Sequence, residues 1–174
     1  MKPTKAISMI LMALSLGAFG AIATAAEHKG HSTMSMEMAH EPHHVLAMAY
    51  HRNLATFAKA LHEQTAGASS VNLEFARAAV AEMRRSFDQM KQHHQACMQT
   101  MSVEMQAKMK DKMQQMESHQ NQLNDQLTAL EQEVQSPAPD PKKVSTLASS
   151  VLTHLAAMSK MHQRSRGKNM KMKM

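Results

Sequence analysis

Residues 73–101, LEFARAAVAEMRRSFDQMKQHHQACMQTM, decide the fold of this 174-residue chain. Mostly apolar side chains recur in this stretch at alternating steps of three and four residues, which places them on one face of an α-helix. They are Leu73, Ala76, Val80, Met83, Phe87, Met90, His94, Cys97 and Met101. Such a stripe is typical of a helix that packs against other helices. Because the sequence has no sustained alternation of period two, it predicts an all-α protein.

Three more segments, on either side of this stretch, carry the start and stop signals of helices. Pro42 suits a first helical turn, and Gly67 marks a stop. Ser70 and Ser102 are expected to cap the next two helices, and Asp140 is expected to cap the last one. The expected helices span about 42–66, 71–100, 103–135 and 141–164.

The junction at residues 100–102 lacks Gly and Pro, so two architectures are open there. One continuous helix would be about 100 Å long at roughly 1.5 Å per residue, which is out of proportion to a compact domain. A turn is therefore favoured over a continuous helix. Because short connections make neighbouring helices antiparallel, the sequence predicts an up-down-up-down four-helix bundle over residues 42–164.

The two ends of the chain have the compositions of an export signal and of tail segments. Two lysines precede an apolar run, and residues 23–25 (Ala-Thr-Ala) have the small-residue pattern of a cleavage site. Residues 1–25 are interpreted as a secretory signal peptide, with a membrane anchor as the alternative, and the mature protein is expected to be periplasmic or secreted. Residues 26–41 predict a flexible Met/His-rich arm, and residues 165–174 predict a flexible, basic, Met-rich tail.

Methionine and histidine dominate the composition, with 20 Met and 12 His against 3% aromatic residues. The single cysteine, Cys97, is open to three interpretations: a metal ligand, an intermolecular disulfide in a homodimer, or a buried thiol. Lysine and arginine crowd the C-terminal tail. Nucleic acid is excluded as the partner of an exported protein, and at most a peripheral contact with an anionic membrane surface is expected.

Sulfur and imidazole side chains are concentrated where one end of the predicted bundle would lie. The starts of the first and third helices meet the ends of the second and fourth there, and the residues recur at offsets of four and seven along single helix faces. The opposite end has His62 as its one histidine, and His119 is expected on a solvent-exposed face. The candidate metal ligands are His44, Met48, His51, Met90, His94, Cys97, Met98, Met101, Met105, Met109, His154, Met158, Met161 and His162.

Both tails carry the pattern M-x-M-x-M, at residues 34–38 and 170–174. Because core packing cannot explain methionine in a flexible segment, we interpret these positions and the nearby histidines as weaker sites of metal capture. They are His28, His31, Met34, Met36, Met38, His40, His43, Met170, Met172 and Met174. Thioether sulfur favours Cu(I) or Ag(I), whereas imidazole accepts copper, nickel or zinc.

Signatures of catalysis are weak in this sequence. The E-x-x-H spacing of carboxylate di-iron bundles occurs at residues 37–40 and 41–44, but both copies lie in or beside the arm rather than on two core helices. The chain carries no H-E-x-x-H zinc motif and no phosphate-binding loop. The sequence therefore predicts a binding protein without catalytic residues, and a di-iron oxidase is the most distant alternative.

The segment MKQHHQACMQTM, Met90–Met101, and the M-x-x-x-M steps of the helices resemble those of the periplasmic Met/His-rich helical metal-resistance proteins, above all the copper-binding ones. The likeness covers about residues 28–174 and rests on composition and helix layout. It implies copper binding, buffering or delivery, with Cu(I) favoured and silver, nickel or zinc as other ions. A periplasmic metal exporter or chaperone is then the expected partner.

Two other functions remain open. The periplasmic helical chaperones and zinc-resistance-associated proteins carry L-T-x-x-Q repeats, which residues 127–131 (Leu-Thr-Ala-Leu-Glu) approximate once. A chaperone-like protein would use its methionines as an adaptable apolar surface. An oxidant scavenger would use them because methionine oxidises reversibly to its sulfoxide.

Overall fold

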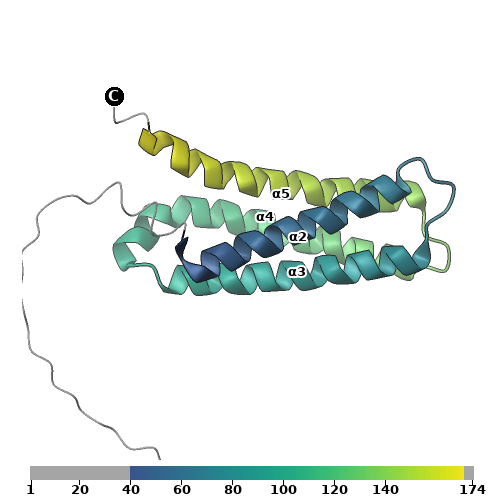
Figure 1. Cartoon of the computed structure of the whole chain (residues 1–174), viewed down its shortest axis with the longest axis horizontal. Helices are drawn as coiled ribbons and strands as arrows, with labels where there is room; N and C mark the ends of the chain where they lie inside the picture. Colours follow the sequence, from purple (N-terminus) through teal and green to yellow (C-terminus); the bar gives the residue numbers. More distant parts are fainter. Residues whose placement is uncertain (1–39, 171–174) are drawn as a thin grey trace, which may run out of the picture.

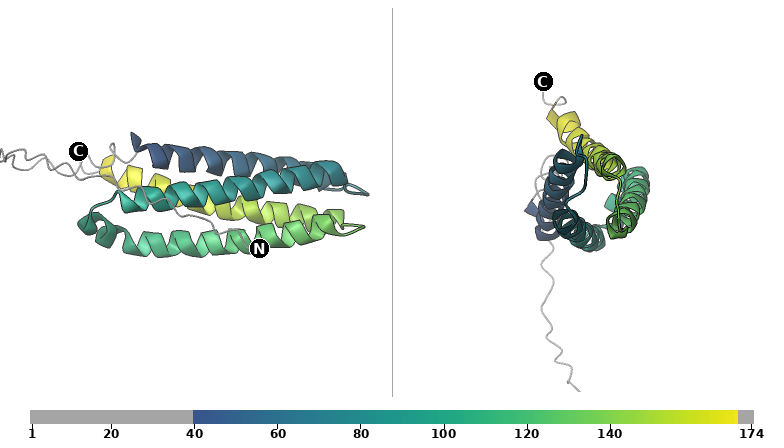
Figure 2. Two further views of the ribbon diagram at one scale, coloured as in Figure 1. Left: turned by 90° about the horizontal axis from the view of Figure 1, so that it is seen from below. Right: turned by 90° about the vertical axis from the view of Figure 1, so that its right-hand side faces the viewer.

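The computed structural model of the chain describes residues 40–170, and it describes side chains over residues 40–162. This part of the chain forms an antiparallel four-helix bundle without strands (Figure 1). The helices are α2 (Pro42–Thr65), α3 (Leu73–Gln99), α4 (Val103–Gln135) and α5 (Pro141–Met170). Each helix packs against its two neighbours around a closed ring, as the end-on view in Figure 2 shows. The predicted all-α, up-down-up-down architecture is confirmed.

Polar side chains start the helices, mostly at the predicted positions. Ser102 Oγ accepts a hydrogen bond from the Met105 backbone N–H at 3.2 Å, and this caps α4. Asp140 Oδ1 accepts one from the Lys142 N–H at 2.9 Å at the start of α5. The prediction that Ser70 caps the second helix is wrong. Asn72 is the cap of α3 because its side-chain oxygen accepts from the Phe75 N–H at 3.1 Å, and the helix begins two residues later than expected.

The junction between α3 and α4 is a turn, as favoured, rather than a continuous helix. The helix α3 ends at Gln99, and the Thr100 hydroxyl donates to the Cys97 carbonyl oxygen at 2.8 Å. Because that hydrogen bond and the Ser102 cap satisfy backbone groups at the two helix ends, the turn needs neither Gly nor Pro. At the other end of the bundle, α2 stops just before Gly67, whose φ of 74° suits glycine.

The last helix is longer than the sequence predicts. The helix α5 continues to Met170, so the expected flexible tail from residue 165 is helical over most of its length. The expected signal peptide, most of the Met/His-rich arm and residues 171–174 lie outside the described residues. Among the described helices, none is both long enough and apolar enough to cross a membrane.

Leucine and valine fill the middle of the bundle and the end where α2 connects to α3 and α4 connects to α5. Their side chains are 0–2% exposed, and burial of each contributes roughly 1.5–3 kcal/mol. They include Leu54, Leu61, Val80, Leu123, Leu127, Leu130, Val134, Val144, Val151 and Leu155. Arg84 on α3 adds a two-pronged ion pair to Glu131 on α4, at 2.7 and 2.9 Å. This apolar packing fixes the relative position of the four helices and therefore of the side chains beyond it.

Candidate metal centre

The helices bring the sulfur- and imidazole-rich segments together at one end of the bundle (Figure 1). This cavity end consists of the starts of α2 and α4 and the ends of α3 and α5. The opposite leucine end contains the α2–α3 and α4–α5 connections. At the cavity end, the rings of His44 on α2 and His162 on α5 have centroids 5.7 Å apart. The convergence that the antiparallel order predicts is therefore present.

A small cavity of about 20 Å³ lies between the four helices at this end. A cavity needs roughly 10–15 Å³ to hold one water molecule, so this one has room for a single particle of about that size. All four helices line it, and most of the lining side chains carry sulfur or imidazole. The lining residues are His44, Ala47, Met48, His51, Met90, His94, Met116, Gln120, Met158 and His162.

Two of the cavity histidines are held by backbone carbonyl groups. His51, which is 9% exposed, donates from Nε2 to the Leu155 carbonyl oxygen at 3.1 Å. His162 donates from Nδ1 to the Met158 carbonyl oxygen at 2.9 Å. In each neutral ring the other nitrogen then keeps its lone pair, Nδ1 in His51 and Nε2 in His162. A hydrogen bond of this kind orients a histidine that binds metal through its second nitrogen.

Burial keeps two of these rings neutral to lower pH than an ordinary histidine. It lowers the pKa of His51, an effect that the hydrogen bond to Leu155 opposes and the nearby His162 reinforces. Burial also lowers the pKa of His94, and the charges of His162 and His44 lower it further. Because only a neutral imidazole can bind a metal, the cavity presents His51 and His94 in the binding form near neutral pH.

The sulfur atoms at the cavity come from one half-buried and three buried methionines. Met90 and Met158 are each 3% exposed, Met116 is 7% exposed, and Met48 is half-buried. The three buried side chains also belong to the continuous apolar core, so each packs as an ordinary core residue would. A thioether has no proton to lose and is a soft ligand. The cavity therefore offers sulfur that is independent of pH next to imidazole that is not.

Gln120 on α4 is a cavity residue that the sequence prediction missed. Its side-chain Nε2 is buried and has no hydrogen-bond partner in the protein, which costs roughly 1–3 kcal/mol for a buried donor. Met116, one turn earlier, also lines the cavity, and its thioether sulfur was not among the predicted metal ligands. Their spacing of four places both on one face of α4, and this was the signal available in the sequence.

Cys97 does not line the cavity. It is 3% exposed, and its thiol donates a hydrogen bond to the Glu41 carboxylate. Burial, with this bond and the Glu41 charge, raises the pKa of the thiol to about 11. Of the three interpretations of this cysteine, the structure favours the buried thiol, because the side chain does not line the cavity and a disulfide between chains needs an accessible sulfur.

Six other predicted ligands also lie away from the cavity lining. Met98, Met101, Met105 and Met109 are half-buried around the α3–α4 turn, and Met161 is half-buried against the apolar core. His154 lies with its ring centroid 5.8 Å from that of His119. Burial lowers the pKa of His154, as does the charge of His119. Seven of the fourteen predicted ligands therefore line the cavity, and the other seven lie elsewhere.

Of the predicted weaker sites, only two have described side chains. His40 is exposed. His43 is half-buried, and its Nδ1 lies 3.0 Å from Nδ1 of His93 on α3. His28, His31, Met34, Met36, Met38, Met172 and Met174 lie outside the described residues, and Met170 is described only as the last residue of α5.

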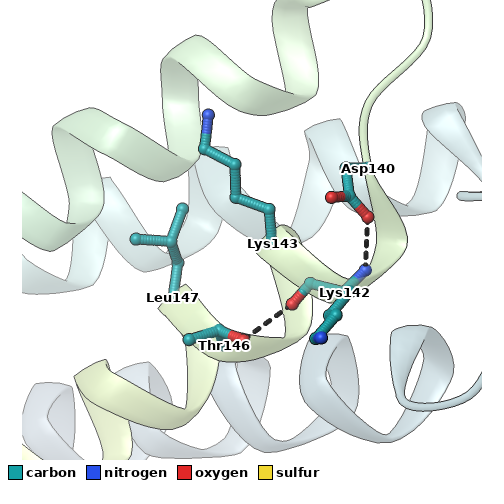
Figure 3. A pocket seen from close by; sticks show the side chains of 5 residues that line it. All are labelled: Asp140, Lys142, Lys143, Thr146 and Leu147. Carbon is teal, nitrogen blue, oxygen red and sulfur yellow. Dashed lines mark hydrogen bonds between the residues drawn. The ribbon is translucent and has the colours of Figure 1, made fainter.

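An open surface depression of about 360 Å³ lies at the leucine end, beside the start of α5 (Figure 3). Its lysines do not form an anion site. The Asp140 carboxylate already accepts from the Lys142 backbone N–H, and Lys143 forms an ion pair with Glu133 at 2.5 Å. The depression therefore has no uncommitted cluster of charge that would select a ligand.

Within the described residues, no three His, Cys, Asp or Glu side chains are placed around one point as ligands of a single ion. An ion in the cavity would therefore need methionine sulfur as well as imidazole. Comparison of the chain with family models, with curated proteins and with solved structures finds no match. The donor atoms themselves are therefore the basis on which a function is inferred.

Proposed function

We propose that this protein binds a soft monovalent metal ion, Cu(I) foremost, in the cavity between its four helices. The observation that carries the proposal is the cavity lining, in which imidazole and thioether groups from four helices surround room for one small particle. Thioether ligands select Cu(I) and Ag(I) over hard cations, and imidazole accepts copper in either oxidation state.

The candidate donors for one ion are one or two of His51, His94 and His162 together with the sulfurs of Met90 and Met158. The three histidines come from three helices, and backbone carbonyls already orient two of them. The two methionines are nearly fully buried. Three or four of these donors suffice for one ion.

The biological role that follows is sequestration, buffering or delivery of copper by an exported protein, without catalytic turnover. The apolar run and small-residue pattern of residues 1–25 support export. The M-x-M-x-M segments at both ends of the chain support capture of ions before they reach the cavity. Silver, nickel and zinc are the competing ions to test.

A Cu(I) titration of the mature protein against a competing chelator tests this proposal. The variant M90L/M158L removes two cavity sulfurs while keeping their apolar volume, a change that costs less than about 1.5 kcal/mol per site. We expect its tightest Cu(I) site to weaken at least tenfold. The matched control is M83L, because Met83 is fully buried in the same core but does not line the cavity.

Equal Cu(I) affinity in the wild type and M90L/M158L would overturn the proposal, as would equal weakening in M83L. Cu(I) should also raise the melting temperature of the wild type, since an ion that binds only the folded state stabilises it. A chaperone-like protein would instead protect client proteins without metal, and its melting temperature would not respond to Cu(I).

A further inference from the structure

A second pair of histidines bridges two helices beside the cavity. His119 on α4 and His154 on α5 are both half-buried, and their ring centroids lie 5.8 Å apart at an angle of 52°. The expected placement of His119 on a solvent-exposed face is wrong, because its ring packs against the ring of His154 on α5. Neither residue lines the cavity.

One ring nitrogen of this pair has no partner in the protein. His119 Nδ1 is buried without a hydrogen bond, although leaving such an atom unsatisfied costs free energy. An ion about 2 Å from one nitrogen of each ring would hold two imidazole centroids no more than roughly 6.4 Å apart. The observed 5.8 Å lies inside that limit, so the separation of the two rings is compatible with one shared ion.

Besides His44 and His162 at the cavity, a third close pair of histidines provides a comparison. His43 and His93 have centroids 5.3 Å apart, but their Nδ1 atoms already form a hydrogen bond at 3.0 Å. Tyr50 also stacks on His93, at 5.7 Å and 7°. An ion there would have to break a hydrogen bond that exists, whereas an ion at His119 would satisfy an atom that has no bond.

We propose that His119 and His154 form a second metal site, which joins α4 to α5 and takes a borderline divalent cation such as Zn²⁺. Imidazole is a ligand for such ions. Since the described side chains offer no third His, Cys, Asp or Glu for the same ion, the ion has two protein ligands and the affinity is modest. The site is independent of the proposed copper site, because it uses neither the cavity nor thioether sulfur.

Thermal unfolding of the full mature protein in a series of Zn²⁺ concentrations tests the proposal. An ion held by two helices is released when they separate, so Zn²⁺ should raise the melting temperature by several degrees. Histidines in a segment that does not fold bind Zn²⁺ equally before and after unfolding and add nothing to this shift. We expect the shift to disappear in H119Q/H154Q and to persist in H43Q/H93Q.

Persistence of the shift in H119Q/H154Q would overturn the proposal, as would its loss in H43Q/H93Q alone. Nuclear magnetic resonance of the wild-type imidazole groups provides a second test that needs no stable double variant. The ring signals of His119 and His154, assigned with the single variants H119Q and H154Q, should move together on addition of Zn²⁺, and unmoved signals would contradict the site. Because Cu(I) affinity should be unchanged in H119Q/H154Q, failure here is distinguishable from failure of the copper proposal.

Discussion

At the leucine end of the bundle, His62 Nδ1 lies 2.9 Å from the Ser145 hydroxyl and 3.1 Å from the Ser145 carbonyl oxygen, among fully buried Leu and Val side chains. At the cavity end, His51 is also held by a carbonyl group, but it lies beside other imidazoles, methionines and an unpartnered Gln120. His62 completes the packing between two helices. His51 instead lines a cavity that the surrounding side chains do not fill. This is the difference expected between a histidine with a structural role and one that binds a ligand.

The comparison also separates stability from binding. The leucine end and the middle of the bundle hold the helices together, and the cavity end has a buried amide donor without a partner, which costs free energy. Natural proteins accept such local costs mostly at functional sites. Mutations at the two ends should therefore have opposite consequences for folding and for metal binding.

The largest effect is expected from Leu127→Ala at the leucine side of the core. Leu127 is fully buried, and its truncation should reduce the free energy of unfolding by about 2–5 kcal/mol. Urea unfolding followed by circular dichroism measures the loss. Cu(I) affinity of the folded fraction should stay within about twofold, and a tenfold loss of affinity would show that the two ends are not separable.

A smaller effect of opposite sign is expected from Gln120→Leu at the cavity end. The substitution keeps the side-chain volume and removes the buried Nε2 group that has no partner. The free energy of unfolding without metal should therefore rise by about 1 kcal/mol. A decrease in the same urea experiment would mean that Gln120 is satisfied and that the cavity end carries no such cost.

The smallest effect is expected from pH. The folded-state pKa values of His51 and His94 lie below the ordinary value of 6.5, so unfolded chains bind protons first as the pH falls. Stability without metal should be complete above pH 6.5 and decline below it. The lowered pKa values of Glu41 and Glu133 act only below their ordinary value of 4.5.

Urea unfolding at pH 7, 6 and 5 measures this dependence, with His94→Gln as the comparison. Between pH 7 and 5, the free energy of unfolding should fall less steeply in His94→Gln than in the wild type. The variant lacks one imidazole whose pKa is lowered by burial in the folded state. Equal slopes would contradict the placement of a neutral His94 beside the cavity.

The fold was largely predictable because its signals are local. Apolar spacing defined the buried face of α3, and Pro42, Ser102 and Asp140 act at helix starts as expected. The error at Ser70 arose because Asn72 is an equally good cap only two residues away. The continuation of α5 to Met170 was missed because the polar and basic residues after 164 carry no apolar stripe, and Gly167 favours a stop there.

The sequence predicted which helix faces carry the candidate site. It did not predict which residues along each face lie at the level of the cavity. Periodicity placed Met105 and Met116 on one face of α4, yet at 1.5 Å per residue they lie roughly 16 Å apart, and only Met116 reaches the cavity. Cys97 lies one turn beyond His94 and turns toward Glu41 instead. Gln120 was missed because an amide is not a soft ligand, and the lack of a partner for its Nε2 is visible only in three dimensions.

The most direct test of the central claim is to locate the metal itself. Crystals of the mature protein loaded with one equivalent of Cu(I) should show a single strong anomalous peak between Met90, Met158 and His51, inside the cavity. Peaks only on residues 26–41 or 170–174, with none among the four helices, would contradict the account and leave the cavity as a packing defect of a methionine-rich bundle.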